Sequence, residues 1–93
     1  MLNERLRELR EAHNMTQVGL AKILNVSKQS VSNWENDNIQ PSIEILMKLA
    51  NIFSVSTDYL LCRDNRRYLE ITNLTEEEIA HIQQIISDII KNK

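Results

Sequence analysis

Apolar residues recur along most of the chain at spacings of three and four, with polar residues between them. Because an α-helix has 3.6 residues per turn, this spacing places the apolar side chains on one helix face. Glycine and proline, which interrupt helices, occur only once each. The pattern therefore predicts an all-α protein.

Five helical segments are expected in the first two thirds of the chain. The first covers about residues 2–13 and the third about residues 27–36, and the second, fourth and fifth begin at residues 16, 42 and 56. Serine and threonine oxygens cap helix N-termini, and asparagine tolerates the left-handed conformation just after a helix. The predicted N-caps are Thr16, Ser27, Ser42 and Ser56, and the predicted left-handed residues are Asn14 and Asn25. We expect these segments to form one domain over residues 2–61.

The apolar stripes of these segments supply the expected core. In order along the chain they are Leu2, Leu6, Leu9, Leu20, Ala21, Leu24, Val31, Trp34, Ile45, Leu46, Leu49, Ile52, Tyr59, Leu60 and Leu61. Trp34 lies three residues after Val31, so both belong on one helix face, and we assign the tryptophan to the core rather than to base stacking.

The pattern changes after Leu61. Residues 62–74 begin with a polar run and are expected to form a linker. Thr75 and Glu78 then have the spacing of a capping box, which predicts a helix over residues 75–92. Six isoleucines fall on an arc of about 140° of this helix at ~100° per residue. They are Ile79, Ile82, Ile85, Ile86, Ile89 and Ile90.

This isoleucine face is too apolar to remain in water, because burial is worth about 0.8 kcal/mol per CH₂ group. It can pack on the chain's own helices or on the same helix of a second subunit. The polar linker before it favours the second arrangement, so we expect a dimerisation element. The sequence leaves open whether two such helices run parallel or antiparallel.

Acidic residues outnumber basic ones by 13 to 11, giving a net charge of −2. Domains that bind nucleic acid are usually basic, so any DNA site must be a local feature.

Residues 16–36 offer a candidate DNA site, because they form two short helices joined by a tight turn. The outer face of the second helix carries amides, hydroxyls and the single charge of Lys28, which are groups that suit base edges.

A set of short motifs runs through this part of the chain. They are Thr16-Gln17, Leu20-Ala21, Val26-Ser27, the run from Val31 to Asn36, Pro41-Ser42 and the run from Val55 to Leu61. With them, residues 2–61 resemble the Xre family, the phage-repressor and Cro-like helix-turn-helix domains. The resemblance implies a five-helix lambda-repressor-like bundle whose third helix enters the major groove, and a homodimer that reads an inverted repeat.

The resemblance also implies roles for individual residues. Lys28, Gln29 and Asn33 match base-reading positions, with Ser32 as a further candidate. The expected phosphate contacts are Gln17, Ser30, Asn36 and Asn38. Arg10 and Glu35 match positions that the family joins in an internal ion pair, so we assign them to structure.

These features predict a transcriptional regulator, a repressor, that binds a pseudo-palindromic operator on double-stranded DNA with half-sites about 34 Å apart. The alternative is an antitoxin or accessory protein that binds a protein partner through the C-terminal helix. The acidic balance of the chain favours this alternative. Its test is whether the chain retains DNA at low salt or instead recovers a stoichiometric protein partner.

Other functions find no support in the sequence. No nucleophile, base and oxyanion donor can be assembled, so we expect no enzymatic activity. Cys62 is the single cysteine and no cysteine and histidine cluster has metal-ligand spacing, so no metal or other cofactor is expected. The chain lacks an apolar run of about 18 residues, so we expect no membrane span and a cytoplasmic location.

Overall fold

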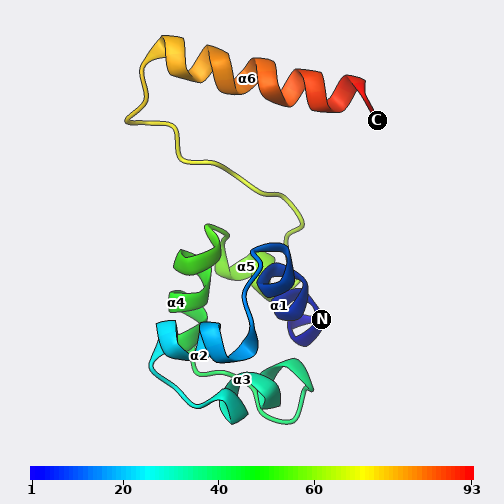
Figure 1. The fold of residues 1–93 in the computed structure, drawn as a ribbon, viewed down its shortest axis with the longest axis vertical. Coiled ribbons are helices and arrows are strands. Elements are labelled where there is room, and N and C mark those ends of the chain that lie inside the picture. The colour runs from blue at the N-terminus through cyan, green and yellow to red at the C-terminus, as the bar shows by residue number, and fades with distance from the viewer.

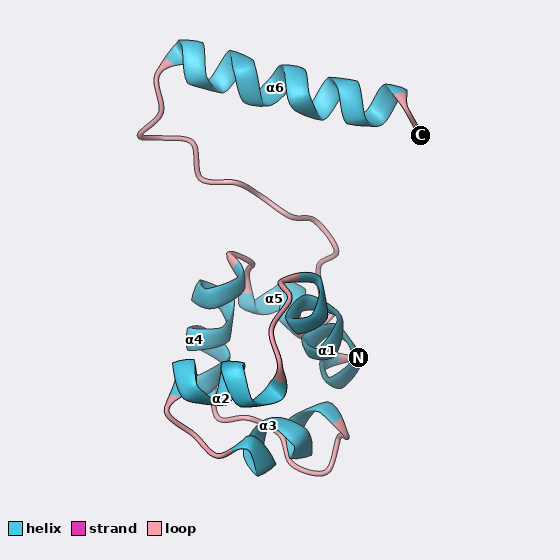
Figure 2. Cartoon of the chain, viewed as in Figure 1, coloured by secondary structure: helices cyan, strands magenta, loops and turns pink.

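The computed structural model describes residues 1–93 and contains six α-helices and no strand, which confirms the all-α fold. The helices are α1 (Leu2–Ala12), α2 (Gln17–Leu24), α3 (Lys28–Glu35), α4 (Ile43–Phe53), α5 (Thr57–Leu60) and α6 (Glu76–Lys91). Helices α1 to α5 form a bundle, and α6 stands apart from it (Figure 1). An extended linker without helix joins the two parts (Figure 2), and the molecule measures 44 × 29 × 24 Å.

Side-chain caps begin four of the five bundle helices. Thr16, Ser27, Ser42 and Ser56 each accept a hydrogen bond from the backbone N–H three residues further on, at 2.9–3.2 Å. Each bond satisfies one of the N–H groups that a helix start leaves without a partner. All four predicted N-caps are therefore confirmed.

Left-handed residues follow several of the helices. Asn14 and Asn25 have φ angles of 56° and 57°, as predicted, and turn the chain without glycine. Asp37, Ser54 and Cys62 also have positive φ angles, which the sequence pattern did not predict. In this bundle the left-handed positions are therefore all occupied by residues other than glycine.

The core lies where α1, α2, α3, α4 and α5 meet. Its buried apolar residues are Leu2, Leu6, Leu9, Leu20, Ala21, Leu24, Val31, Trp34, Leu49, Ala50, Phe53 and Leu60. The expected core is confirmed in its main part, and five of the expected residues differ. Ile45, Leu46, Ile52 and Tyr59 are only partly buried against this core. Leu61 is the C-cap of α5 and is exposed, because the helix ends one residue before it.

The first part of the linker is held against the bundle by a group that we call the Tyr59 clamp, consisting of Arg5, Tyr59, Asn65 and Arg67. The Arg5 guanidinium donates to the Tyr59 carbonyl oxygen at 2.7 Å and to Asn65 Oδ1 at 3.2 Å. It also lies over the Tyr59 ring at 4.1 Å, and Arg67 lies over the same ring at 5.2 Å. These cation–π contacts fix the direction in which the linker leaves the bundle.

Helix α6 begins with the predicted capping box. Glu78 N–H donates to Thr75 Oγ1, and the Thr75 N–H donates back to Glu78 Oε1. No residue of α6 is buried, and Ile79 and Ile82 are only partly covered. Ile82 lines a hollow of about 690 Å³ together with residues of the linker and of the end of α4. The isoleucine face therefore does not pack on the chain's own bundle.

None of the six helices has the length and apolar character needed to cross a membrane.

Candidate nucleic-acid interface

Helices α2 and α3 form a helix-turn-helix motif. Helix α2 ends at the left-handed Asn25, and α3 starts two residues later at the Ser27 cap. Between them Val26 packs against the core, and Val31 and Trp34 on the inner face of α3 are buried. These contacts fix α3 by one side and leave its other side free.

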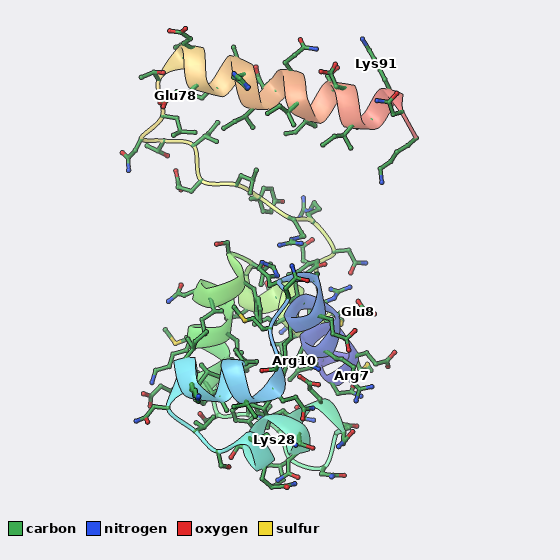
Figure 3. The ribbon with its side chains drawn as sticks, viewed as in Figure 1. Arg7, Glu8, Arg10, Lys28, Glu78 and Lys91 are labelled. Atoms are coloured by element: carbon green, nitrogen blue, oxygen red, sulfur yellow. The ribbon has the colours of Figure 1, made fainter.

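The free side of α3 carries the predicted base-reading residues. Lys28 and Gln29 are exposed, and Ser32 and Asn33 are half-exposed one turn later. Residues four apart lie on the same helix face, so these four side chains form one surface. Lys28 projects at the end of the molecule opposite α6 (Figure 3), and it makes no ion pair.

Two amides on this surface are joined. Gln29 Nε2 donates to Asn33 Oδ1 at 3.0 Å, which leaves the Gln29 oxygen and the Asn33 nitrogen for other partners. A free amide acceptor and a free amide donor side by side match the donor and acceptor that adenine presents in the major groove. The amide pair is therefore suited to base recognition.

The predicted phosphate-contacting residues lie around α3 but differ in how free they are. Gln17 is the first residue of α2, and Asn38 is exposed in the loop after α3. Asn36 is exposed, and its Nδ2 donates to Ser32 Oγ at 3.2 Å. The Ser30 hydroxyl is half-buried and engaged with Ser27 Oγ at 3.0 Å, so Ser30 is the least available of the four.

A buried carboxylate lies behind this surface. The Glu35 side chain is fully buried, and Arg10 binds both of its oxygens, with Nε at 2.7 Å and Nη2 at 3.0 Å. Gln17 Nε2 donates to the same carboxylate at 3.1 Å, and Arg7 Nε lies 3.5 Å away. The ion pair that the resemblance implied is present, and it joins α1, α2 and α3.

Two opposing effects act on the charge of Glu35. Burial alone would raise its pKa, but the hydrogen bonds from Arg10, Gln17 and Arg7 and the positive charge of Arg10 outweigh burial, so the net pKa lies below its ordinary value. The hydrogen bond to Glu35 likewise raises the pKa of Arg10. Both groups therefore stay charged at neutral pH, and the carboxylate adds no free negative charge to the free side of α3.

Arg7 is a contributor that sequence reasoning missed. Its Nη2 donates to the Glu35 carbonyl oxygen at 3.4 Å and to Asn36 Oδ1 at 3.3 Å. Arg7 thus orients a candidate phosphate contact from a position 29 residues away in the sequence. Its three-residue spacing from Arg10 on α1 was the available clue, since residues three apart share a helix face.

One negative charge remains at the edge of the surface. Asp37 is exposed, and its Oδ1 accepts a hydrogen bond from Gln40 at 3.0 Å but has no basic partner. It lies between Asn36 and Asn38 in the sequence. A phosphate bound at those residues would therefore meet an uncompensated carboxylate, which weakens the attraction at this point.

The chain is similar to known helix-turn-helix proteins. The family described as Helix-turn-helix matches residues 6–60. The HTH-type transcriptional regulator ImmR of Bacillus subtilis (strain 168) is 37% identical over 87 residues, which cover 94% of this chain and 68% of ImmR. Repressor protein C2 of Salmonella phage P22 is 34% identical over 64 residues, and these cover 30% of its length. This chain thus spans only part of these relatives.

Two solved structures extend the comparison. The P22 c2 repressor in complex with synthetic operator 9T has a TM-score of 0.65 and 34% sequence identity, covering 69% of this chain and 97% of the other. A transcriptional regulator from Listeria innocua has a TM-score of 0.66 and 28% identity, covering 96% of this chain and 92% of the other. The second match therefore includes most of α6.

Proposed function

This chain belongs to the Xre-like helix-turn-helix family, and from that premise we propose that it is a transcriptional repressor that binds a pseudo-palindromic DNA operator as a homodimer. The observation that carries the proposal is the free side of α3, where the joined amides of Gln29 and Asn33 stand beside Lys28. The chain acts by binding rather than by catalysis, and we place it in the cytoplasm.

Helix α3 enters the major groove with its free side toward the bases. The Gln29–Asn33 amide pair recognises adenine, and Lys28 reaches guanine. Each good pairing discriminates against a wrong base by about 1–3 kcal/mol. The buried Glu35 ion pair supports this role, because it holds α3 against α1 while the reading side remains in solvent.

Contacts to the DNA backbone set the register of α3. Gln17 keeps one amide hydrogen free after donating to Glu35, and it lies at the N-terminus of α2, where the helix dipole attracts a phosphate. Asn36, held by Arg7, and the exposed Asn38 approach the backbone from the other end of α3, with Ser30 as a weaker candidate.

Pairing of two chains through α6 supplies the affinity that one bundle lacks. The net charge of −2 gives little non-specific attraction to phosphates, so a single bundle binds weakly. Joining two reading heads makes the second binding event intramolecular and raises the overall affinity by a factor of about 10²–10⁴. The unpartnered isoleucine face of α6 is the surface available for this pairing.

Selection of the full chain against random DNA, followed by titration at a fixed low salt concentration, tests the proposal. We expect an enriched inverted repeat with half-site centres about 34 Å apart. The Gln29→Ala variant should lose preference at one base pair in each half-site. The Lys48→Ala variant is the control, because Lys48 is exposed on α4 and pairs only with Glu44. Unchanged preference in Gln29→Ala would contradict the role of α3.

An antitoxin or accessory role is the weaker alternative, since the relatives and structures compared above are described as regulators and a repressor. This alternative predicts that the full chain, used as bait in a pull-down, recovers a stoichiometric protein partner through α6 and retains no DNA at low salt.

A further inference from the structure

We infer that the two α6 helices of the homodimer pair in antiparallel orientation, with Ile79 of one helix opposite Ile89 of the other. The inference rests on the proposed homodimer and adds the geometry of its interface. The occupant of the isoleucine face is thus a second copy of this chain.

The isoleucine face has the spacing of a two-helix seam. Ile79, Ile82, Ile86 and Ile89 follow one another at intervals of three, four and three, as the inward positions of paired helices do. An antiparallel register that sets Ile79 against Ile89 also sets Ile82 against Ile86. Every inward isoleucine then meets another isoleucine, and Ile85 and Ile90, which are exposed in the single chain, flank the seam.

Charge along α6 decides between the two orientations. Its first turn carries Glu76, Glu77 and Glu78, whereas its end carries Lys91 and Lys93. A parallel pair would gather six carboxylates at one end and four ammonium groups at the other. An antiparallel pair brings each acidic start beside a basic end and opposes the two helix dipoles.

The position of these charges strengthens the argument. At ~100° per residue, Glu76 lies just beyond one edge of the isoleucine stripe and Glu78 lies within its other edge, whereas Glu77 and Lys91 lie on the opposite side of α6. Helix α6 ends at Lys91, and the backbone N–H of Lys93 donates to the Ile90 carbonyl oxygen at 3.2 Å, so a turn keeps Lys93 beside the end of the helix. In the antiparallel pair, Glu76 and Glu78 of one helix therefore lie beside the seam, close to Lys93 at the end of the other helix.

The span between the two reading heads agrees with this orientation. Helix α6 has 16 residues and is about 24 Å long. In an antiparallel pair the linkers enter at opposite ends, about 24 Å apart, whereas in a parallel pair they enter about 8–10 Å apart. Operator half-sites are about 34 Å apart, so antiparallel pairing already separates the two bundles by most of that distance.

Charge reversal at the two ends of α6 tests the orientation in the full chain. The Glu76→Lys variant and the Lys93→Glu variant should each weaken the dimer about tenfold at low salt, measured by sedimentation at several concentrations. Combining the two substitutions should restore the dimer. Loss of α6 helicity alone would make the double variant weaker still, because it carries both unfavourable dipole interactions. Failure of this restoration would overturn the inference.

Disulfide trapping gives an independent readout in a Cys62→Ser background. A mixture of Ile79→Cys and Ile89→Cys chains should form the mixed disulfide, identified by mass, in preference to either homodisulfide. An Ile79→Cys homodisulfide would overturn the antiparallel arrangement but leave the proposed homodimer intact. A chain that sediments as a monomer would instead overturn the homodimer itself, and the inference with it.

Discussion

Gln17 Nε2 donates a hydrogen bond to Glu35 Oε1 at 3.1 Å, so a proposed phosphate contact is held by the carboxylate that joins α1 to α3. One hydrogen of this amide is thus bonded within the protein, and the other is the one that we propose for a phosphate. The proposed DNA contact and the stability of the bundle therefore depend on the same side chain.

Replacing Gln17 by alanine should therefore lower both the affinity for DNA and the free energy of unfolding. DNA binding should weaken about fivefold to tenfold for operator and non-specific DNA alike, because a phosphate contact carries no sequence information. The free energy of unfolding should fall by about 1–2 kcal/mol through loss of a hydrogen bond to a charged group. Gln84→Ala, which removes an exposed glutamine bonded to Asp88 on α6, should change neither. A change of base preference in Gln17→Ala would contradict the assignment.

Replacing Glu35 by glutamine should destabilise the bundle by about 3–5 kcal/mol, because Arg10 keeps a largely buried charge without its counter-ion. Urea unfolding of the purified chain measures the loss. The matched comparison is Lys48→Ala, which breaks an exposed ion pair with Glu44 and should cost less than about 1 kcal/mol. Similar losses of unfolding free energy in Glu35→Gln and Lys48→Ala would show that the buried Glu35 ion pair stabilises the bundle no more than an exposed pair does.

Acid should weaken the wild-type bundle more than the Glu35→Gln variant. Because the pKa of Glu35 is lowered in the folded state, its stabilising effect is complete above the unfolded pKa of about 4.3 and is lost as the pH falls through the folded pKa. The unfolding free energy of the wild type should therefore fall more steeply than that of the variant between about pH 5 and pH 3. Parallel slopes for the two proteins would show that Glu35 has an ordinary pKa.

Substitution of Asn25 tests the turn of the helix-turn-helix motif. This residue has a φ angle of 57°, a conformation in which a β-carbon costs about 1–2 kcal/mol unless the side chain compensates. Asn25→Ala should lower the melting temperature, whereas Asn25→Gly should leave it unchanged or raise it slightly. Equal effects of the two substitutions would show that the left-handed conformation is not the constraint at this position.

The isoleucine face of α6 should control assembly without affecting the bundle. Ile86→Glu places a charge within this face and should abolish the dimer in sedimentation. Its control, Gln84→Glu, places the same charge on the opposite side of α6 and should leave the dimer intact. The melting temperature of the bundle in the monomeric variant should remain close to that of a dissociated wild-type chain, because no α6 residue is buried. A dimer that survives Ile86→Glu would exclude this face as the interface.

Local features of the fold could be predicted from the sequence because their physical causes lie within a few residues. A serine or threonine oxygen reaches an N–H three residues away, so Thr16, Ser27 and Thr75 reveal helix starts directly. Asn25 similarly marks a helix end through its own conformational preference. The alternation of apolar and polar positions then identified most of the core.

Contacts between distant residues could not be predicted in this way. Arg5 and Tyr59 are 54 positions apart, and no local pattern indicates that they meet. The His13 ring packs edge-on against Phe53, with ring centroids 5.1 Å apart, and no local pattern indicates this contact either. The link from Gln17 to Glu35 also depends on how three helices come together. The roles of Lys28, Gln29, Ser32 and Asn33 toward DNA remain predictions, supported by their exposure on α3.

If two chains pair as proposed, the Tyr59 clamp limits which operators the dimer can accept. Because Asn65 and Arg67 are held against the bundle, the free tether to α6 is residues 68–74, with a reach of about 25 Å, rather than the whole of residues 62–74, with about 45 Å. A short tether tolerates few changes in the distance or helical phase between half-sites. In the proposed dimer, an aromatic ring on α5 thus sets which operator geometries are accepted, although it is remote from α3, the helix proposed to read the bases.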